Sequence, residues 1–166
     1  MTPGALGQVT ALSDSHDLAS FDSGVPTLDH WLRHSARVGQ AAGTAATYVL
    51  ARGDRVIGYY SLAMSAVAHT QGPSRLRRGM PDPVPVILLA RLAVDLEERC
   101  RHIDGYLLVD ALRRCVQGGR EFGARAVVVD AVDTRAAAFY RHFGFHDLVG
   151  RRLWRRLSDI AAALGT

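Results

Sequence analysis

The stretch RLAVDLEERCRHIDGYLLVDALRR, residues 91–114, has the pattern of a strand, a turn and a long helix. The start of a helix exposes unpaired backbone N–H groups and carries a partial positive charge, so a turn of this kind often binds phosphate. Glycine normally lets the backbone approach the phosphate closely. This turn instead carries Cys100, His102 and Asp104. The spacing therefore predicts a phosphate-binding turn that is weakened by its own side chains, or an ordinary helix start whose acidic residue favours the helix dipole.

An aromatic segment, AAAFYRHFGF, contains the second residue with chemical potential, Tyr140. A phenol can act as a general acid toward a leaving group. A tyrosine beside Phe139 on a helix is more often a core residue, and the residues alone leave both interpretations open. The seven histidines have no metal-ligand spacing, so no metal site is expected.

Arginines form the third pattern. All 20 basic residues are arginine, the net charge is +4 and the pI is about 9.6. Coding bias explains such usage as well as an anionic partner does, although the planar guanidinium suits phosphate. Two groups have a spacing that suits a nucleic-acid backbone, and a solvated basic face is the alternative for each member. These groups are Arg33 with Arg37, four apart on an expected helix, and Arg75, Arg77 and Arg78 in one loop.

Length and composition indicate one globular domain spanning residues 1–166. Cys100 and Cys115 cannot build a disulfide framework, which favours a reducing cytoplasm. The N-terminus MTPGALGQVT lacks the features of a secretory signal, and the long uncharged run 56–74 is interrupted by Gly, Ser, His and Gln. We therefore expect a cytoplasmic protein without a membrane span.

The first half of the chain predicts a strand, a helix and a hairpin. Turn residues in FDSGVPT precede the apolar spacing Leu28, Trp31, Leu32, so one helix is expected that frays at Gly39 and Gly43. The Gly-Asp pair of RGDR predicts a tight turn between two antiparallel strands. The expected strands are GQVTALSD, ATYVLA and VIGYYSLAMSAVAH, and the loop is 70–83.

The second half alternates strands and helices. The continuous apolar run 84–94 is typical of a central strand covered on both faces. A helix from about Ile103 to Gly118 follows, and later segments predict a strand at 124–132, a helix from Asp133 or Thr134 to Gly144, a strand at 151–157 and a short amphipathic tail. This order predicts an α/β (α+β) fold, with a mixed, mostly antiparallel central sheet and helices on both faces.

Four segments, taken in their order along the chain, resemble the GCN5-related N-acetyltransferases (GNAT), and more narrowly the acetyltransferase toxins of ribbon-helix-helix toxin–antitoxin pairs. The segments are FDSGVPTLDHWL, YYSLA, RLRRGMPDPVPVILLARLAVD and AAAFYRHFGF, and the resemblance covers about residues 8–160. It implies a GNAT fold and the acetyl-CoA-dependent acetylation of the α-amino group of an aminoacyl-tRNA, which blocks translation. It also implies a homodimer and a partner antitoxin.

The resemblance further implies roles for individual residues. The family binds the CoA pyrophosphate in a turn written Q/RxxGxG/A, which corresponds here to Arg99, Cys100, Arg101, His102, Ile103 and Asp104, with Gly105 next in the chain. Leu92, Ala93 and Val94 would offer backbone groups to the pantetheine arm, with Phe143 as a further contact. Tyr140 would protonate the departing thiolate. The two arginine groups would bind tRNA.

Asp104 is the substitution with the largest expected consequence. Two like charges about 4 Å apart cost roughly 4 kcal/mol at an effective dielectric constant near 20, which is about a thousandfold in affinity. Arg99, Arg101, a protonated His102 or an outward-pointing Asp104 would soften this repulsion. Two alternative functions therefore stay open: a catalytically degenerate GNAT protein that binds an antitoxin, and a GNAT enzyme for a small amine or a protein N-terminus.

Overall fold

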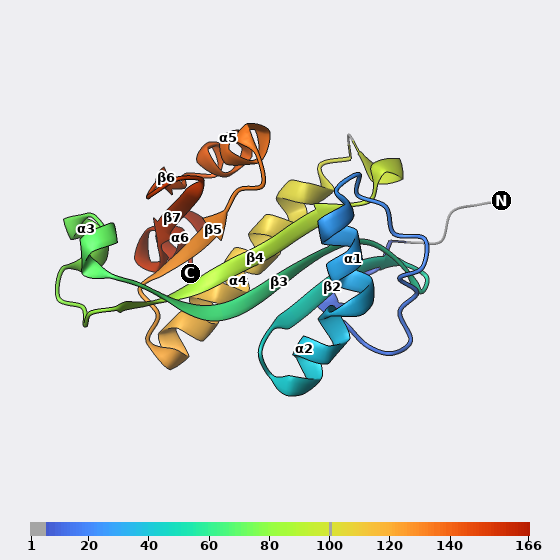
Figure 1. The fold of residues 1–166 in the computed structure, drawn as a ribbon, viewed down its shortest axis with the longest axis horizontal. Helices are drawn as coiled ribbons and strands as arrows, with labels where there is room; N and C mark the ends of the chain where they lie inside the picture. Colours follow the sequence, from blue (N-terminus) through green and yellow to red (C-terminus); the bar gives the residue numbers. More distant parts are fainter. Residues whose placement is uncertain (1–5, 100) are drawn as a thin grey trace. The chain divides into compact units, whose positions relative to one another are not determined.

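A computed structural model of the chain describes residues 6–99 and 101–166. Seven strands form one sheet in the order β1-β2-β3-β4-β5-β7-β6 (Figure 1). The elements are β1 (Thr10–Ala11), α1 (Pro26–His34), α2 (Ala36–Ala42), β2 (Ala46–Arg52), β3 (Arg55–Val67), η1 (His69–Gln71), α3 (Ser74–Arg77), β4 (Val84–Val94), η2 (Leu96–Glu98), α4 (Ile103–Phe122), β5 (Ala126–Asp130), α5 (Thr134–His142), β6 (His146–Asp147), β7 (Arg152–Arg156) and α6 (Leu157–Leu164). Strand β4 pairs with β5 in parallel, whereas β1–β2, β2–β3, β5–β7 and β6–β7 are antiparallel. The predicted mixed sheet with helices is confirmed.

The chain divides into two compact units. The first contains the chain up to Ala63 together with Arg91–Ala111, and the second contains Met64–Ala90 and Leu112–Thr166. The single domain 1–166 that we expected from the sequence stays a prediction.

In the first unit, the side chains of neighbouring β3 residues lie on opposite faces of the sheet. The Tyr59 hydroxyl donates to the carbonyl of Leu28 on α1 at 2.7 Å, while the Tyr60 hydroxyl donates to the Asp110 carboxylate on α4. This alternation follows from the two-residue repeat of a strand. Helices α1 and α2 therefore cover one face, and the first half of α4 covers the other. The core on the α1 face includes Phe21, Leu32 and Val49.

The first helix differs from the prediction of one continuous helix. Ser35, with φ −125° and ψ −26°, separates α1 from α2. Helix α2 continues through Gly39 and ends at Gly43, whose φ of 74° is the left-handed conformation that glycine adopts easily. Arg33 and Arg37 consequently lie on different helices rather than one turn apart on the same helix.

The second unit contains a core of Val67, Leu76, Val86, Val128 and Trp154, among others. Helix α4 runs to Phe122, past the predicted end at Gly118. Gly119 inside the helix packs closely against Leu157, since a Cβ at this position would lie 2.2 Å from Leu157 Cδ1. The predicted loop 70–83 contains the short helices η1 and α3, and the two-residue strand β6 was not predicted.

Candidate functional site

The turn before α4 has the backbone conformation of a glycine position. His102 has a φ of 58°, and among the described non-glycine residues it is the one with positive φ. Left-handed backbone costs an L-residue roughly 1 kcal/mol, which glycine avoids. The structure thus supports the assignment of His102 to the first glycine of the phosphate turn. His102 therefore has the backbone conformation that a glycine would adopt at lower cost.

The first N–H groups of α4 determine what the turn can bind. Within residues 6–99 and 101–166, no acceptor is found for the backbone N–H of Ile103 or Asp104. The next N–H, from Gly105, donates to Oδ1 of Asp104 at 2.8 Å. The Asp104 carboxylate therefore occupies one donor that an anion would otherwise use. The Asp104 side chain is exposed, so solvent screens its charge.

Glu98, which the sequence analysis did not single out, organises the arginines beside this turn. Its side chain is 5% exposed and accepts from Arg52 Nε at 2.6 Å and Arg52 Nη2 at 3.0 Å. Arg101 lies 3.6 Å away and Arg55 lies 4.0 Å away. The hydrogen bond from Arg52 lowers the pKa of Glu98 against the opposing effect of burial. The one sequence feature that could have pointed to Glu98 is its position close to Arg99 and Arg101 in LEERCR.

This network changes the expected balance of charge at the turn. Arg101 is partly neutralised by Glu98, so it offsets Asp104 less than we expected from the sequence. Arg99 is exposed, and no acceptor for its side chain is found among the described residues. Its guanidinium lies beside the FDSG segment, since a Cβ on Gly24 would be 3.6 Å from Arg99 Nη2. Cys100 lies outside the described residues.

The FDSG segment is held against the end of β4 by buried carboxylates. Asp29 accepts from the Ser23 hydroxyl at 2.6 Å and from the Ser23 N–H at 3.1 Å. Asp95, which follows β4, accepts from the Asp22 N–H at 3.0 Å, and Leu96 N–H donates back to the Asp22 carbonyl at 2.8 Å. Hydrogen bonds to charged groups are stronger than neutral ones, so these contacts fix the segment.

The end of β4 extends beyond its pairing with β5. The parallel register runs from Val86↔Ala126 to Leu89↔Val129, whereas β4 continues to Val94. Leu92, Ala93 and Val94 therefore lie beyond the part of β4 that pairs with β5. Ala93 is buried in the core on the α1 face, and Leu92 and Val94 are half-buried.

Tyr140 lies in the second unit, near the end of α5. Its side chain is 6% exposed, and its ring contacts those of Phe139 and Phe145 at centroid distances of 5.2 Å and 5.7 Å. Phe143 contacts Phe139 edge-to-face at a centroid distance of 5.0 Å, and its carbonyl accepts from Arg155 at 2.8 Å. The segment thus forms an aromatic cluster. The catalytic role of Tyr140 and the cofactor contact of Phe143 stay predictions.

The arginines predicted to bind tRNA fall into two groups. Arg33 donates to the Phe21 carbonyl at 2.7 Å, and Arg37 donates to the His16 carbonyl at 2.6 Å, so both hold the segment that precedes α1. Arg75 pairs with Asp159 at 3.1 Å. Arg77 and Arg78 are exposed, and no polar side-chain partner is found for either in the described part of the chain. They are the members whose donors remain available.

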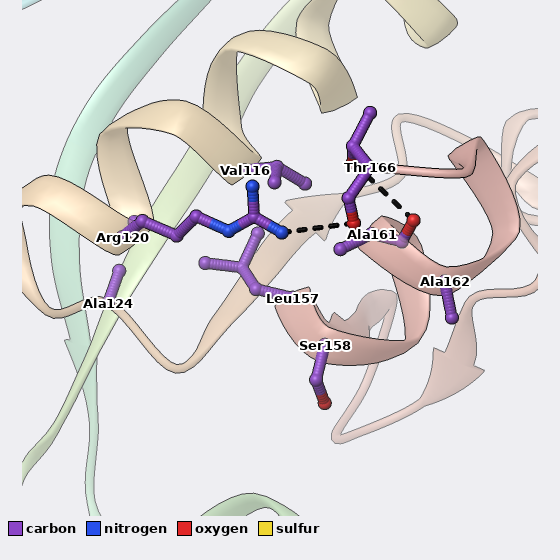
Figure 2. Close-up of a pocket in the computed structure, with 9 residues that line it drawn as sticks. Val116, Arg120, Ala124, Leu157, Ser158, Ala161, Ala162 and Thr166 are labelled. Carbon is purple, nitrogen blue, oxygen red and sulfur yellow. Dashed lines mark hydrogen bonds between the residues drawn. The ribbon is translucent and has the colours of Figure 1, made fainter.

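A pocket of about 410 Å³ lies within the second unit, between α4 and α6 (Figure 2). Leu157 forms part of its apolar lining, and Arg120 donates to the Thr166 carbonyl at 3.0 Å beside it. The predicted site residues lie elsewhere. Among the described residues, no cluster of metal-binding side chains is found and no helix is both long and apolar enough to span a membrane.

Comparison with known proteins gives the decisive observation. No protein-family model matches the chain. A tRNA-acetylating toxin of Mycobacterium tuberculosis is 49% identical over 134 residues, which are 81% of this chain and 81% of that protein. The chain belongs to this toxin family. The resemblance to acetyltransferase toxins that the sequence suggested is confirmed.

Solved structures agree with this membership. AtaT in complex with acetyl-methionyl-tRNAfMet is 26% identical, with a TM-score of 0.88 over 98% of this chain and 100% of that chain. A tyrosine-to-phenylalanine mutant of AtaT bound to acetyl-CoA and the C-terminus of the antitoxin AtaR is 24% identical, with a TM-score of 0.82 over 97% of this chain and 99% of that chain. The second likeness shows the fold alone, and the predicted GNAT fold is confirmed.

Proposed function

We propose that this protein is an N-acetyltransferase toxin that transfers the acetyl group of acetyl-CoA to the α-amino group of an aminoacyl-tRNA and so blocks translation. The observation that carries the proposal is the 49% identity to a tRNA-acetylating toxin over four-fifths of both chains. An N-acetylated aminoacyl-tRNA has no free amine for peptide-bond formation. Acetyl-CoA is the co-substrate, and no metal is required.

The start of α4 is the proposed site for the CoA pyrophosphate. The left-handed turn at His102 and the N–H groups of Ile103 and Asp104 fit an anion at a helix start. Arg99, Arg101 and Gly105 complete this turn, and Cys100 belongs to it by sequence. Leu92, Ala93 and Val94 hold the pantetheine arm through their backbone groups, and Phe143 is a further contact. Acetyl-CoA supplies an activated acyl group.

Tyr140 is the proposed general acid. The neutral amine attacks the thioester carbonyl, a C–N bond forms and the C–S bond breaks. The phenol of Tyr140 gives its proton to the departing thiolate, and the amine loses its own proton to solvent. General acid catalysis of this kind contributes about 10²- to 10⁴-fold. An aminoacyl ester has an amine of lowered pKa, so a strong protein base is not needed.

Arg77 and Arg78 are the proposed contacts to the tRNA backbone, because their side-chain donors have no partner among the described residues. The donors of Arg75, Arg33 and Arg37 already make intramolecular contacts, with Asp159, Phe21 and His16 respectively. Replacing both Arg77 and Arg78 by Gln should lower the slope of log affinity against log salt by about 2. An unchanged slope would remove both residues from the interface.

The protein is further proposed to act in the cytoplasm as a homodimer and to be neutralised by a ribbon-helix-helix antitoxin. AtaT, which shares its fold, has been solved with the C-terminus of its antitoxin. The reducing environment suits Cys115, which is buried and whose thiol pKa burial raises to about 12. Co-expression with its ribbon-helix-helix antitoxin should restore growth that the toxin alone arrests.

Direct acetylation tests the proposal. Purified protein, labelled acetyl-CoA and a pool of charged tRNA should yield label in the tRNA fraction, and alkaline release should give N-acetyl amino acids. Uncharged tRNA is the matched control and should stay unlabelled. Label in a small amine or a protein N-terminus, with none in charged tRNA, would contradict the proposal.

One observation favours the second candidate, a degenerate protein that only binds an antitoxin. The Asp104 carboxylate occupies the Gly105 N–H. Calorimetric titration separates the two functions, because the degenerate protein binds no acetyl-CoA whereas the enzyme does. Binding that appears only in the His102→Gly/Asp104→Gly double variant would favour the degenerate function.

A further inference from the structure

Arg91 lies inside an otherwise apolar strand. The run VPVILLARLAV forms β4, and its apolar residues are buried or half-buried along its length. The Arg91 side chain is half-buried on the face that carries α1, because its Cζ atom lies 4.0 Å from the centroid of the Trp31 ring. A charged residue at such a position costs free energy unless it is paired or has a use.

Aromatic side chains hold this guanidinium. Trp31 stacks on Tyr59 with a centroid distance of 6.1 Å and an interplanar angle of 11°. Tyr59 is fully buried and fixed by its hydrogen bond to Leu28. A cation over a tryptophan face is stabilised by the ring quadrupole. The arrangement therefore orients Arg91 without using its N–H donors.

None of the described residues accepts a hydrogen bond from those donors. No hydrogen bond or ion pair of the Arg91 side chain is found within residues 6–99 and 101–166. Other half-buried arginines differ, since Arg52 pairs with Glu98 and Arg152 pairs with Asp130. Burial lowers the pKa of Arg91 against a smaller opposing electrostatic effect of Tyr59. The guanidinium still remains charged at every physiological pH.

We propose that Arg91 binds the phosphodiester of the 3′-terminal nucleotide of the acceptor tRNA. The inference rests on the proposed function. Arg91 immediately precedes Leu92–Val94, the backbone that is proposed to hold the acetyl-bearing arm. The aminoacyl ester carries no carboxylate, so the anion closest to the reacting amine is the terminal phosphodiester. A planar guanidinium with free donors matches a phosphate in charge and geometry.

Steady-state acetylation with Arg91→Gln provides the test. Hydrogen bonds to charged groups correspond to about a ten- to hundredfold change, so the KM for aminoacyl-tRNA should rise by that factor. The KM for acetyl-CoA should change less than about twofold. Arg91→Lys keeps the charge but not the planar fork, so it should give an intermediate value. Arg113→Gln removes the same charge from an exposed position of α4 and should leave both values unchanged.

A truncated tRNA makes the assignment specific. With uncharged tRNA, so that no aminoacyl group is lost, removal of the terminal adenosine with its phosphate should weaken binding to the wild-type protein more than binding to Arg91→Gln, by the factor that the Arg91→Gln substitution itself costs on the full-length tRNA. Equal losses on truncation for both proteins would overturn the proposal. So would an unchanged KM for tRNA, a loss of acetyl-CoA binding in Arg91→Gln, or a defect confined to antitoxin binding. A wild-type protein that acetylates no tRNA but shows the truncation effect would sink the proposed function and leave this contact standing.

Discussion

Helices α4 and α5 each begin next to an aspartate, but only α5 is capped by it. At α5, the Asp133 side chain accepts from the Ala136 N–H at 2.8 Å, three residues into the helix. At α4, the Asp104 side chain reaches only the N–H of its neighbour Gly105, and the N–H groups of Ile103 and Asp104 have no acceptor among the described residues. The start of α5 is therefore capped by a side chain, whereas the start of α4 keeps two N–H groups without an acceptor among the described residues.

The difference teaches that residue type alone does not identify an N-cap. A capping residue has extended backbone and lies before the helix, as Asp133 does with φ −158°. Asp104 lies inside α4 rather than before it. Among the described residues, its carboxylate accepts only from the N–H of its neighbour Gly105. The open start is the one that carries the strained His102.

The largest expected effect is on the acetylation rate and follows from replacing Tyr140 in α5. Replacing Tyr140 by Phe should lower the acetylation rate at least about a hundredfold because the general acid is removed. The circular dichroism spectrum and the affinity for acetyl-CoA should be retained. Phe139→Leu, at an adjacent position of the same aromatic cluster, is the control and should keep most of the activity. Unchanged turnover in Tyr140→Phe would remove this residue from the chemistry.

Glu98 supports the open helix start, and its loss should be the next largest effect. Replacing Glu98 by Gln leaves Arg52 without its buried partner, so the melting temperature should fall by several degrees. Because the pKa of Glu98 is lowered in the folded protein, its contribution is present above the unfolded value and is lost as pH falls through the folded value. The wild-type protein should lose more stability than Glu98→Gln on acidification below about pH 4.5. Parallel pH profiles would contradict this role.

Asp104 tests whether the open start binds an anion. In an exposed position the repulsion between this carboxylate and a phosphate is close to its value in water, so Asp104→Asn should tighten acetyl-CoA binding about fivefold rather than a thousandfold. Calorimetry at low and high salt measures the change, and the gain should shrink at high salt. If the wild-type protein and Asp104→Asn bind acetyl-CoA with the same affinity at both salt concentrations, Asp104 does not face the phosphates.

The smallest expected effect concerns the sealed helix. Asp133→Ala should destabilise the protein by about 1 kcal/mol because the Ala136 N–H loses its cap. Acetyl-CoA affinity should stay the same, in contrast to Asp104→Asn. A gain in affinity for acetyl-CoA in Asp133→Ala would break the distinction between the two helix starts.

The elements that carry the predicted site could be recognised because their sequence signals are local. The continuous apolar run of β4, the first turn of α4 and the AAAFYRHFGF segment are short-range patterns, and the element order agrees with them. The break at Ser35 and the extension of α4 to Phe122 were missed, because they depend on packing rather than on propensity. Arg91 was visible as a charge in an apolar run, but its stacking partner was not.

The sequence by itself determined the fold class and the family and predicted the substituted phosphate turn, since each follows from residues that are close along the chain. Only the tertiary structure decided which arginines are already used: Arg101 by Glu98, Arg33 by Phe21, and Arg37 by His16. It also brought Trp31 against Arg91. The physical reason is that charge and aromatic contacts act over a few ångströms in space, and the fold alone brings together residues that lie far apart in the chain.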